Sequence, residues 1–416
     1  MIIDFTVSNF LSFRDSQTLS FVADTPYTTH SEHLLDTPLK DLKLLKTVVI
    51  YGANASGKSN LLKALHQLKF LVLTSAQNTP NESLAVSPFV LDKQMQKEPS
   101  FFEINFFCND IKYNYSVLLD SEKVHYEYLS YFPKKYKKNV FTRDLTESGE
   151  YVYNFGDDLK PKRIYDDIAL KTSDNVLFLS KAVQENSKFL KNIYDWFDLK
   201  LSEESTLEEA AKVIDADAAY KKQFLEFLSS QDISILDVSI DKSSIAEKIL
   251  INQQDISPEV RERVIKNFKD KFVFEIKTYH KDSDGDLIPF DFDSESTGTQ
   301  KLFEISALLL KNQGSSTTCF YVDELSSALH PLLVKNFLKK FQESTNNQMV
   351  CVTHDTHLID PNSLRKDQIY FVEKDAEQSS SIYSLLDFNP LNDRENWELR
   401  YLSGRYGATP FLNLQT

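Results

Sequence analysis

Hydrophobic and polar positions alternate at the start of the chain and then give way to apolar runs. Apolar residues stand at positions 3, 5 and 7 and polar residues at positions 4, 6 and 8. This period of two predicts a strand with one buried face. The polar stretch from Asp24 to Asp41 predicts a loop. The run LLKTVVIY at residues 44–51 is mostly apolar, which is typical of parallel strands that are buried on both faces.

The pattern after this second strand is helical. Apolar residues recur at positions 61, 62, 64, 65 and 68, the spacing of an amphipathic helix. Residues 100–153 are rich in aromatic and β-branched types, so we expect the strands of a meander or of hairpins there. The period turns helical again over residues 174–268, most clearly over residues 208–228. Pro258 fits the first turn of another helix.

The last third of the chain predicts strands again. KFVFEIKTYH at residues 271–280 and LIPFDF at residues 287–292 predict a hairpin. TTCFYVDE at residues 317–324 and NQMVCVTHD at residues 347–355 each predict a buried strand that ends in polar residues. The fold class is therefore α/β. We expect a core sheet built from residues 1–84 and 271–416, a β-rich lobe at residues 85–173 and a helical insertion at residues 174–270.

Composition excludes several classes of protein. The 416 residues are 41% hydrophobic and 26% charged, which is ordinary for a globular chain and argues against disorder. The net charge of −14 restricts contact with nucleic acid to a local patch. The chain lacks an apolar run of about eighteen residues and a signal-like start, so we expect no membrane span and no secretory signal. Three scattered cysteines exclude a disulfide scaffold, and the cytoplasm is the expected compartment.

Residues 52–59, GANASGKS, match the phosphate-binding pattern G-x-x-x-x-G-K-[ST] in full, between a predicted strand and a predicted helix. Gly52 and Gly57 let backbone N–H groups turn toward phosphate oxygens, and the start of the helix adds positive charge. Lys58 would reach the β- and γ-phosphates, and the Ser59 hydroxyl would be a ligand of Mg²⁺. A chance match is the alternative, which the full pattern in this context disfavours. ATP and Mg²⁺ are the expected cofactors, and the remaining predicted nucleotide-binding residues of the loop are Asn54, Ala55, Ser56 and Asn60.

Two further predicted strands are followed by residues that could take part in ATP hydrolysis. Asp323 and Glu324 follow an apolar strand; Asp323 would hold Mg²⁺, and Glu324 would orient and polarise the attacking water. A solvated acidic turn is the alternative. His354 also follows an apolar strand, and its imidazole could donate a hydrogen bond to the γ-phosphate. The alternatives for His354 are a structural histidine and a metal site with His357, although HDTH plus one acid falls short of a ligand set.

Ser296 and Gly298 precede the amphipathic pattern LFEISALLL. A hydroxyl and a glycine at the start of a helix form an end that attracts anions. Simple capping of that helix is the alternative, which sequence does not separate from an anion site.

The order of these motifs resembles that of ABC-type ATPases. More closely, the chain is similar to the compact SMC-like ATPases of prokaryotic defence loci (the AAA15/AAA21 and RloA/AbiLi type), which are related to the ATPase domain of the OLD nucleases. The phrases SNFLSFRD, ESTGTQKLF, DELSSALHP, THDTHL and YLSGRYGATPFL carry this resemblance. It covers nearly the whole chain and implies an ABC/SMC-head-like P-loop ATPase with a β-rich lobe and a helical insertion.

The resemblance implies a role for individual residues. Ser296 and Gly298 match the signature turn, which in such ATPases faces the γ-phosphate bound to the other protomer. His354 matches the switch histidine. Gln184 matches the glutamine that joins two lobes and contacts Mg²⁺, although a surface glutamine on a helix fits position 184 equally well. The segment with Ser326, Ser327 and His330 would cross between protomers. Thr297, where a glycine is common, and the missing third P-loop glycine depart from the family pattern.

A basic patch is interleaved with aromatic residues between two of the predicted strands. Nucleic-acid contact is one interpretation of this patch, and a solvated lysine-rich loop is the one that we favour. Its residues are Lys134, Lys135, Lys137, Lys138 and Arg143 with Tyr136 and Phe141.

The expected function is ATP hydrolysis in a homodimeric unit that regulates a separately encoded effector, such as a nuclease or Toprim-like protein, in anti-phage defence. A stand-alone DNA-handling ATPase and an ATP-dependent scaffold with little turnover are the alternatives.

Overall fold

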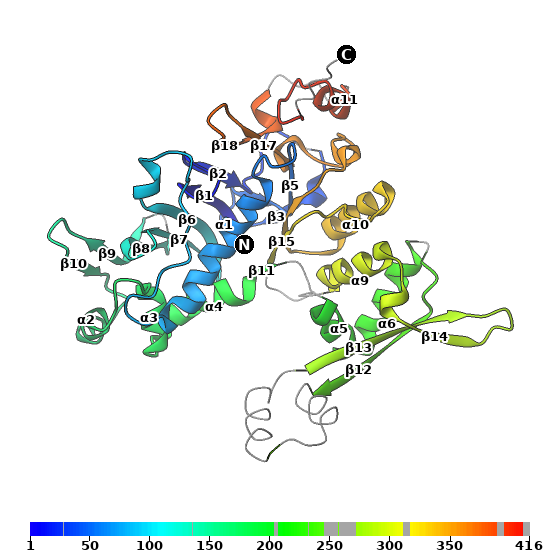
Figure 1. The fold of residues 1–416 in the computed structure, drawn as a ribbon, viewed down its shortest axis with the longest axis horizontal. Coiled ribbons are helices and arrows are strands. Elements are labelled where there is room, and N and C mark those ends of the chain that lie inside the picture. The colour runs from blue at the N-terminus through cyan, green and yellow to red at the C-terminus, as the bar shows by residue number, and fades with distance from the viewer. Residues whose placement is uncertain are drawn as a thin grey trace. The chain divides into compact units, whose positions relative to one another are not determined.

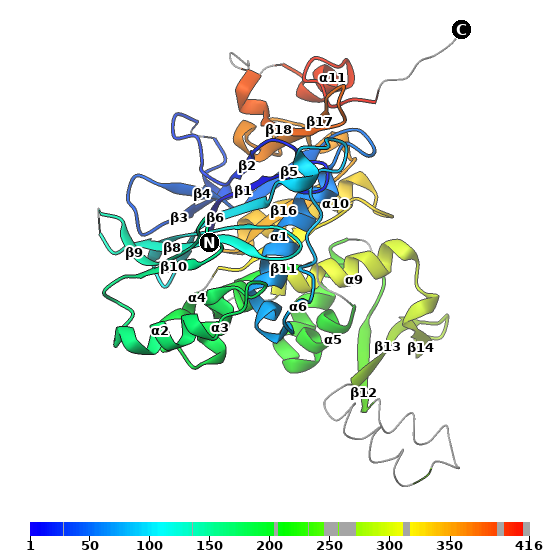
Figure 2. The same ribbon diagram turned by 60° about the vertical axis from the view of Figure 1, so that its left-hand side comes forward.

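The computed structural model describes residues 1–27, 29–134, 136–203, 207–231, 233–244, 257, 272–310, 317–388 and 395–410 (Figure 1, Figure 2). The chain divides into two units. The first comprises Met1–Glu203, Gly314–Ser326 and Phe337–Thr416, and the second comprises Glu204–Gln313 and Ser327–Asn336. Within the described ranges, no helix combines the length and the apolar character that crossing a bilayer requires.

A six-stranded sheet in the first unit takes five strands from residues 1–84 and 271–416, where the core sheet was expected, and one strand, Leu201–Glu203, from the predicted helical insertion. All of its pairings are parallel except that of β17 with β18. The five residues of β5 are all buried, as are those of β15 and β16, which explains their near-continuous apolar sequences. The strand order is β11 (Leu201–Glu203), β15 (Cys319–Val322), β16 (Gln348–Val352), β5 (Thr47–Tyr51), β17 (Ile369–Lys374) and β18 (Ser380–Ser384).

A seven-stranded antiparallel sheet also belongs to the first unit. It contains the predicted meander, but it also includes the opening strand, because β1 pairs with β6 with Phe5 opposite Ile104. The predicted β-rich lobe at residues 85–173 is therefore not separate from residues 1–84; a long-range pairing joins the two. The strand order is β10 (Tyr151–Phe155), β9 (Lys138–Leu145), β8 (Val124–Phe132), β7 (Ile111–Leu119), β6 (Ser100–Cys108), β1 (Ile2–Ser8) and β2 (Gln17–Ser20).

Helix α1 (Lys58–Thr74) connects the two sheets through the core. Its buried leucines, among them Leu61, Leu65 and Leu68, belong to one hydrophobic cluster with side chains of both sheets. The helix contacts β1 of the seven-stranded sheet and β16 of the six-stranded sheet. The other helices of the unit are α2 (Lys162–Leu170), α3 (Phe178–Gln184), α4 (Lys188–Lys200) and α11 (Trp397–Leu402), and a two-stranded sheet pairs β3 (Leu34–Asp36) with β4 (Lys43–Leu45).

The second unit contains helices and a three-stranded sheet. Helices α5 and α6 pack on α9, where the rings of Phe224 and Phe303 lie 4.7 Å apart. The predicted hairpin of β13 and β14 is confirmed. Its elements are α5 (Leu207–Ala216), α6 (Ala218–Ser229), β12 (Asp237–Ser244), β13 (Phe272–Lys281), β14 (Leu287–Asp291) and α9 (Thr297–Leu310), and α10 (Pro331–Ser344) runs from this unit into the first.

The predicted helical insertion at residues 174–270 does not coincide with the second unit. Helices α3 and α4 belong to the first unit, because apolar residues such as Phe178 and Phe197 lie in its core. Strands β11 and β12 add β-structure within the predicted insertion. The helix predicted at Pro258 lies outside the described residues.

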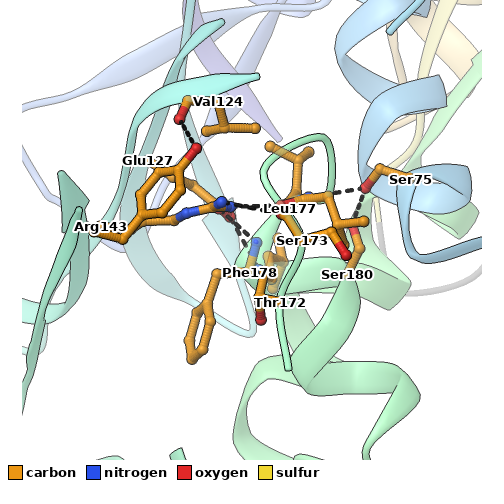
Figure 3. A network of polar contacts seen from close by, with 12 residues as sticks. Ser75, Val124, Glu127, Arg143, Thr172, Ser173, Leu177, Phe178 and Ser180 are labelled. Carbon is orange, nitrogen blue, oxygen red and sulfur yellow. Dashed lines mark hydrogen bonds and ion pairs between the residues drawn. The ribbon is translucent and has the colours of Figure 1, made fainter. Parts of the chain in front are cut away.

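A buried ion pair joins the antiparallel sheet to α3 (Figure 3). Glu127 of β8 and Arg143 of β9 are both fully buried, and Arg143 Nη1 lies 4.0 Å from Glu127 Oε2. Glu127 accepts hydrogen bonds from the N–H groups of Phe178 and Leu179, so its carboxylate caps the start of α3. Burial raises the pKa of Glu127, and Arg143 and these two N–H groups oppose that rise.

Arg143 therefore does not belong to the predicted basic surface patch. Its guanidinium donates to the carbonyl oxygens of Ser173 and Val176 and lies over the Tyr151 ring. Phe141 is also buried, and Lys135 lies outside the described residues. The described remainder of the patch is exposed, namely Lys134, Tyr136, Lys137 and Lys138.

Removal of this buried cation should destabilise the first unit strongly. We expect Arg143→Ala to lower the free energy of unfolding by about 3 to 5 kcal/mol, because it leaves the Glu127 charge buried without its partner. Urea unfolding followed by tryptophan fluorescence measures the change. Glu147→Ala, in the exposed turn between β9 and β10, is the control and should change stability by less than about 0.5 kcal/mol. Equal midpoints for the two variants would contradict a structural role of the pair.

Candidate nucleotide-binding site

Three predicted motifs meet at one edge of the six-stranded sheet. Strands β15, β16 and β5 are adjacent and parallel, with Val322 opposite Cys351 and Val352 opposite Ile50. Their carboxyl ends therefore lie side by side, and the acid pair, the histidine and the glycine loop follow them directly. Ligands bind at the carboxyl ends of strands in open α/β sheets, so this edge is the candidate site.

The glycines of the loop leave room that a side chain would fill. A Cβ atom at Gly52 would meet the Val372 carbonyl oxygen and would lie 2.7 Å from Ser56 Oγ. Gly57 has a φ of 108°, which a side chain rarely tolerates, and it directly precedes the first residue of α1. The loop thus brings backbone close to a helix N-terminus, which is the arrangement that binds phosphate groups.

A pocket of about 280 Å³ opens at this loop. The Ser56 hydroxyl is buried and has no hydrogen-bond partner among the described residues, so it can donate to a ligand oxygen. Asn54 is exposed just before the pocket. The residues present therefore fit a bound nucleotide phosphate. The lining consists of Ala55, Ser56, Gly57, Lys58, Ser59, Asn60 and Lys374.

Lys58 is held against the loop itself. Its side chain is 5% exposed, and Nζ donates to the carbonyl oxygens of Gly52 at 2.9 Å and Ala53 at 2.8 Å. Burial lowers the pKa of Lys58, and the negative charges of Asp323 and Glu324 oppose this shift. The ammonium group thus lies within electrostatic reach of the acid pair.

The acid pair sits on a turn with an unusual backbone. Glu324 adopts a φ of 51°, in the left-handed region, which costs a residue with a side chain about 1 to 2 kcal/mol. The next residue fixes this turn, because the Leu325 N–H donates to the Val352 carbonyl oxygen at 2.9 Å and its side chain is fully buried. Both residues are exposed.

His354 belongs to the same electrostatic cluster. Its partial burial and the neighbouring Lys58 ammonium lower its pKa, while Glu324 and Asp323 oppose that shift. A neutral imidazole at this exposed position has one N–H to donate and one nitrogen to accept. The preceding residue anchors the turn, since Thr353 Oγ1 donates to Ser326 Oγ at 2.8 Å.

Sequence reasoning missed the residues that support the loop. Ser380 Oγ lies 2.6 Å from the Ser56 carbonyl oxygen and 2.8 Å from Ser12 Oγ, and Asn60 donates to Ser12 Oγ at 2.9 Å. Ser12 and Ser380 come from opposite ends of the chain, and neither stands in a motif that names this contact. Lys374 ends β17 beside β5. The sequence signal for Lys374 was an apolar strand that ends in a polar residue, the same pattern that precedes Asp323 and His354.

The structure does not bring Gln184 to the predicted metal site. Its Nε2 donates to the carbonyl oxygen of Ala76, and its Oε1 accepts from Lys181. Ala76 follows the carboxyl end of α1, whereas Ser59 is at the amino end of this 17-residue helix, which is about 25 Å long. The exposed-glutamine interpretation holds for position 184.

Ser296 and Gly298 lie in the second unit, at the start of α9. Ser296 Oγ accepts from the Thr299 N–H at 3.1 Å, so Ser296 caps the helix. A Cβ atom at Gly298 would lie 2.7 Å from the Ala328 carbonyl oxygen. The predicted signature turn therefore packs against the segment that follows the acid pair, and only glycine permits that contact.

Comparison with protein families agrees with this site. Residues 48–360 match the family described as "AAA domain, putative AbiEii toxin, Type IV TA system". The chain belongs to this AAA-domain family. Its matched region contains the glycine loop, the acid pair, Ser296, Gly298 and His354, and the family implies nucleotide binding.

Solved structures that are similar to the chain include heads of SMC proteins. One is the SMC head domain from Thermotoga maritima, at 14% identity and a TM-score of 0.40 over 92% of this chain and 98% of that one. A second is the SmcHead bound to the C-winged helix domain of ScpA, at 14% identity and a TM-score of 0.41 over 92% and 97% of the two chains. No curated protein gives a significant match to the chain.

Proposed function

We propose that this AAA-domain protein hydrolyses ATP with Mg²⁺ and that two copies close on the nucleotide to regulate a separate effector in prokaryotic defence. The proposal of hydrolysis rests on one observation. The glycine loop, the acid pair and His354 all follow the carboxyl ends of adjacent strands. Each group has a matching task in phosphoryl transfer, where catalysis consists of positioning and charge stabilisation.

The tasks follow from the chemistry of the side chains. Lys58 and the N–H groups of the loop bind the phosphates, and the transferred phosphoryl group is attacked in line by water that Glu324 orients and polarises. Ser59 and Asp323 would hold Mg²⁺, which when bound neutralises phosphate charge. Neutral His354 donates a hydrogen bond to the γ-phosphate and loses that contact after hydrolysis.

The two-copy arrangement rests on the separation of the motifs between units. Ser296 is exposed at the start of a 14-residue helix, which is an end suited to bind an anion. It belongs to the second unit, whereas the glycine loop belongs to the first. We infer that the signature turn of one copy meets the γ-phosphate held by the other, so that ATP joins the copies and hydrolysis releases them.

The expected effector is a separately encoded protein, such as a nuclease or a Toprim-like protein. The support is the defence-type resemblance of the sequence together with the family description, which names a toxin of a toxin–antitoxin system. Closing and opening of two copies provides a bistable element that a partner can sense.

A concentration series tests the composite site. We expect ATP turnover per chain to rise with protein concentration, since half of each site comes from the second copy. A phosphate-release assay on the purified chain measures this, with sedimentation velocity in ATP and Mg²⁺ on the same samples. Turnover per chain that is constant across the monomer range would contradict the two-copy site while leaving hydrolysis intact.

One observation favours contact with DNA as a second candidate. The β8–β9 hairpin exposes Lys134, Lys137 and Lys138 around Tyr136, which is 84% exposed, and lysine with aromatic residues suits single strands. If DNA stimulates ATP turnover, the result would support DNA binding by this hairpin. An unchanged turnover rate would favour regulation of a protein effector without DNA contact.

A further inference from the structure

A cluster of two histidines and a glutamate lies away from the nucleotide site. His30, Glu32 and His33 stand at the 3-10 helix η1 (Ser31–His33), and their ligand atoms lie within 4.8 Å of one another. The cluster is next to the start of β5, because the Lys46 N–H donates to the His33 carbonyl oxygen. The glycine loop follows the other end of this strand, about 17 Å away.

The four ring nitrogens of the two histidines all face oxygen atoms. Those of His30 lie 3.2 Å from Glu32 Oε1 and 2.8 Å from the Pro361 carbonyl oxygen. Those of His33 lie 3.5 Å from the same Glu32 oxygen and 2.8 Å from Gln368 Oε1. Neutral imidazoles carry one N–H each, so two N–H groups are available for four contacts with three acceptor oxygens.

The contacts with Pro361 and Gln368 determine which nitrogen of each imidazole carries the proton. A carbonyl oxygen only accepts, so Pro361 fixes the proton on His30 Nε2. Gln368 is oriented by the backbone, since its Nε2 donates to the Thr47 carbonyl oxygen and its Oε1 accepts from the Arg365 N–H. Its Oε1 therefore fixes the proton on His33 Nδ1. The bare nitrogens, His30 Nδ1 and His33 Nε2, both point at the carboxylate of Glu32.

With both rings neutral, the two bare nitrogens and the carboxylate oxygen of Glu32 are three electron-pair donors with no hydrogen between them, and one shared cation would satisfy all three. Protonation of both rings would place two positive charges on imidazoles stacked 4.6 Å apart, which is unfavourable. The two separations from Glu32 Oε1, 3.2 Å and 3.5 Å, match the spacing of about 3.3 Å between ligands of a tetrahedral zinc ion. His33 is also 5% exposed, so its nitrogen is directed into the cluster and away from water.

We propose that His30, Glu32 and His33 form a site for a divalent transition-metal cation, with Zn²⁺ as the best match. Two imidazoles and one carboxylate favour zinc over magnesium or calcium. The hydrogen bonds to Pro361 and Gln368 are the outer contacts that metal-binding histidines make. With three protein ligands and 46% exposure of the Glu32 side chain, the fourth position is open to water.

The site would connect distant parts of the first unit. His30 and His33 come from the segment between β2 and β3, whereas Pro361 and Gln368 lie between His354 and β17. Arg365 already binds this segment through the carbonyl oxygens of Asp24, Tyr27 and Thr29. A bound cation would therefore hold the segment that follows the switch histidine in place.

Zinc binding by the full chain tests this site. After treatment with EDTA and dialysis without nucleotide, we expect about one tightly bound Zn²⁺ per chain by mass spectrometry of the metal. Co²⁺ should give the visible absorption of a four-coordinate site. Glu32→Gln and His30→Ala should each weaken zinc binding by at least about 100-fold, more than the loss of an outer contact does. Both residues are near the surface, and circular dichroism checks that the variants fold.

A matched control separates this site from incidental binding. His125 pairs with Asp120 at 2.5 Å but belongs to no three-ligand group among the described residues. His125→Ala should bind zinc like the original chain. Equal zinc affinity in Glu32→Gln, His30→Ala and the original chain would overturn the proposal, as would the absence of binding at micromolar zinc. None of these outcomes depends on ATP hydrolysis.

Discussion

Lys58→Ala should abolish nucleotide binding. Lys58 is the one cation that the motif directs at the β- and γ-phosphates, and charge-assisted hydrogen bonds are about twice as strong as neutral ones. We expect ATP affinity to fall by at least about 100-fold, which corresponds to about 3 kcal/mol, and turnover to fall with it. Equilibrium binding of a fluorescent ATP analogue measures the loss.

A lysine on the same helix provides the control. Lys63 is exposed on α1, so Lys63→Ala removes the same charge without touching the loop. Its affinity should stay within about two-fold of the original chain. Lys58→Ala that binds ATP as tightly as Lys63→Ala would show that the glycine loop is not the nucleotide site.

Glu324→Gln should separate binding from hydrolysis. The amide keeps the size of the side chain but no longer polarises water, so turnover should fall by about 10² to 10⁴-fold. ATP affinity should remain, because the phosphates are held by the loop and Lys58. If hydrolysis releases the two copies, this variant should accumulate as a dimer in ATP and Mg²⁺, which sedimentation velocity detects.

The control for Glu324→Gln is Glu343→Gln, on the exposed face of α10, which should hydrolyse ATP and dissociate normally. A Glu324→Gln chain that stays monomeric with ATP at every concentration would rule out the shared site. Full ATP turnover in Glu324→Gln would instead show that Glu324 takes no part in hydrolysis.

The local parts of the site could be predicted from sequence, because each is written in consecutive residues. The loop from Gly52 to Ser59, the acid pair and His354 each follow an apolar run, and parallel pairing then aligns their ends. The structure also confirms the β13–β14 hairpin, whose turn and alternating strands lie within about twenty residues.

Burial and distant pairing were not predictable in the same way. Arg143 stands among lysines in the sequence, yet its strand β9 turns that side chain inward, to the carboxylate of Glu127. Gln184 ends a helix whose position depends on packing against the far end of α1. The His30–His33 cluster lies in a stretch that predicted only a loop, and its outer contacts come more than 300 residues later.

The position of β5 has a consequence for synthesis of the protein. Both of its hydrogen-bonding neighbours, β16 and β17, lie within residues 348–374, roughly 300 residues after it. At 5 to 20 residues per second, a ribosome needs about 15 to 60 s to reach them. During that interval the nascent glycine loop has no sheet to support it, so prematurely terminated chains should be unable to retain ATP.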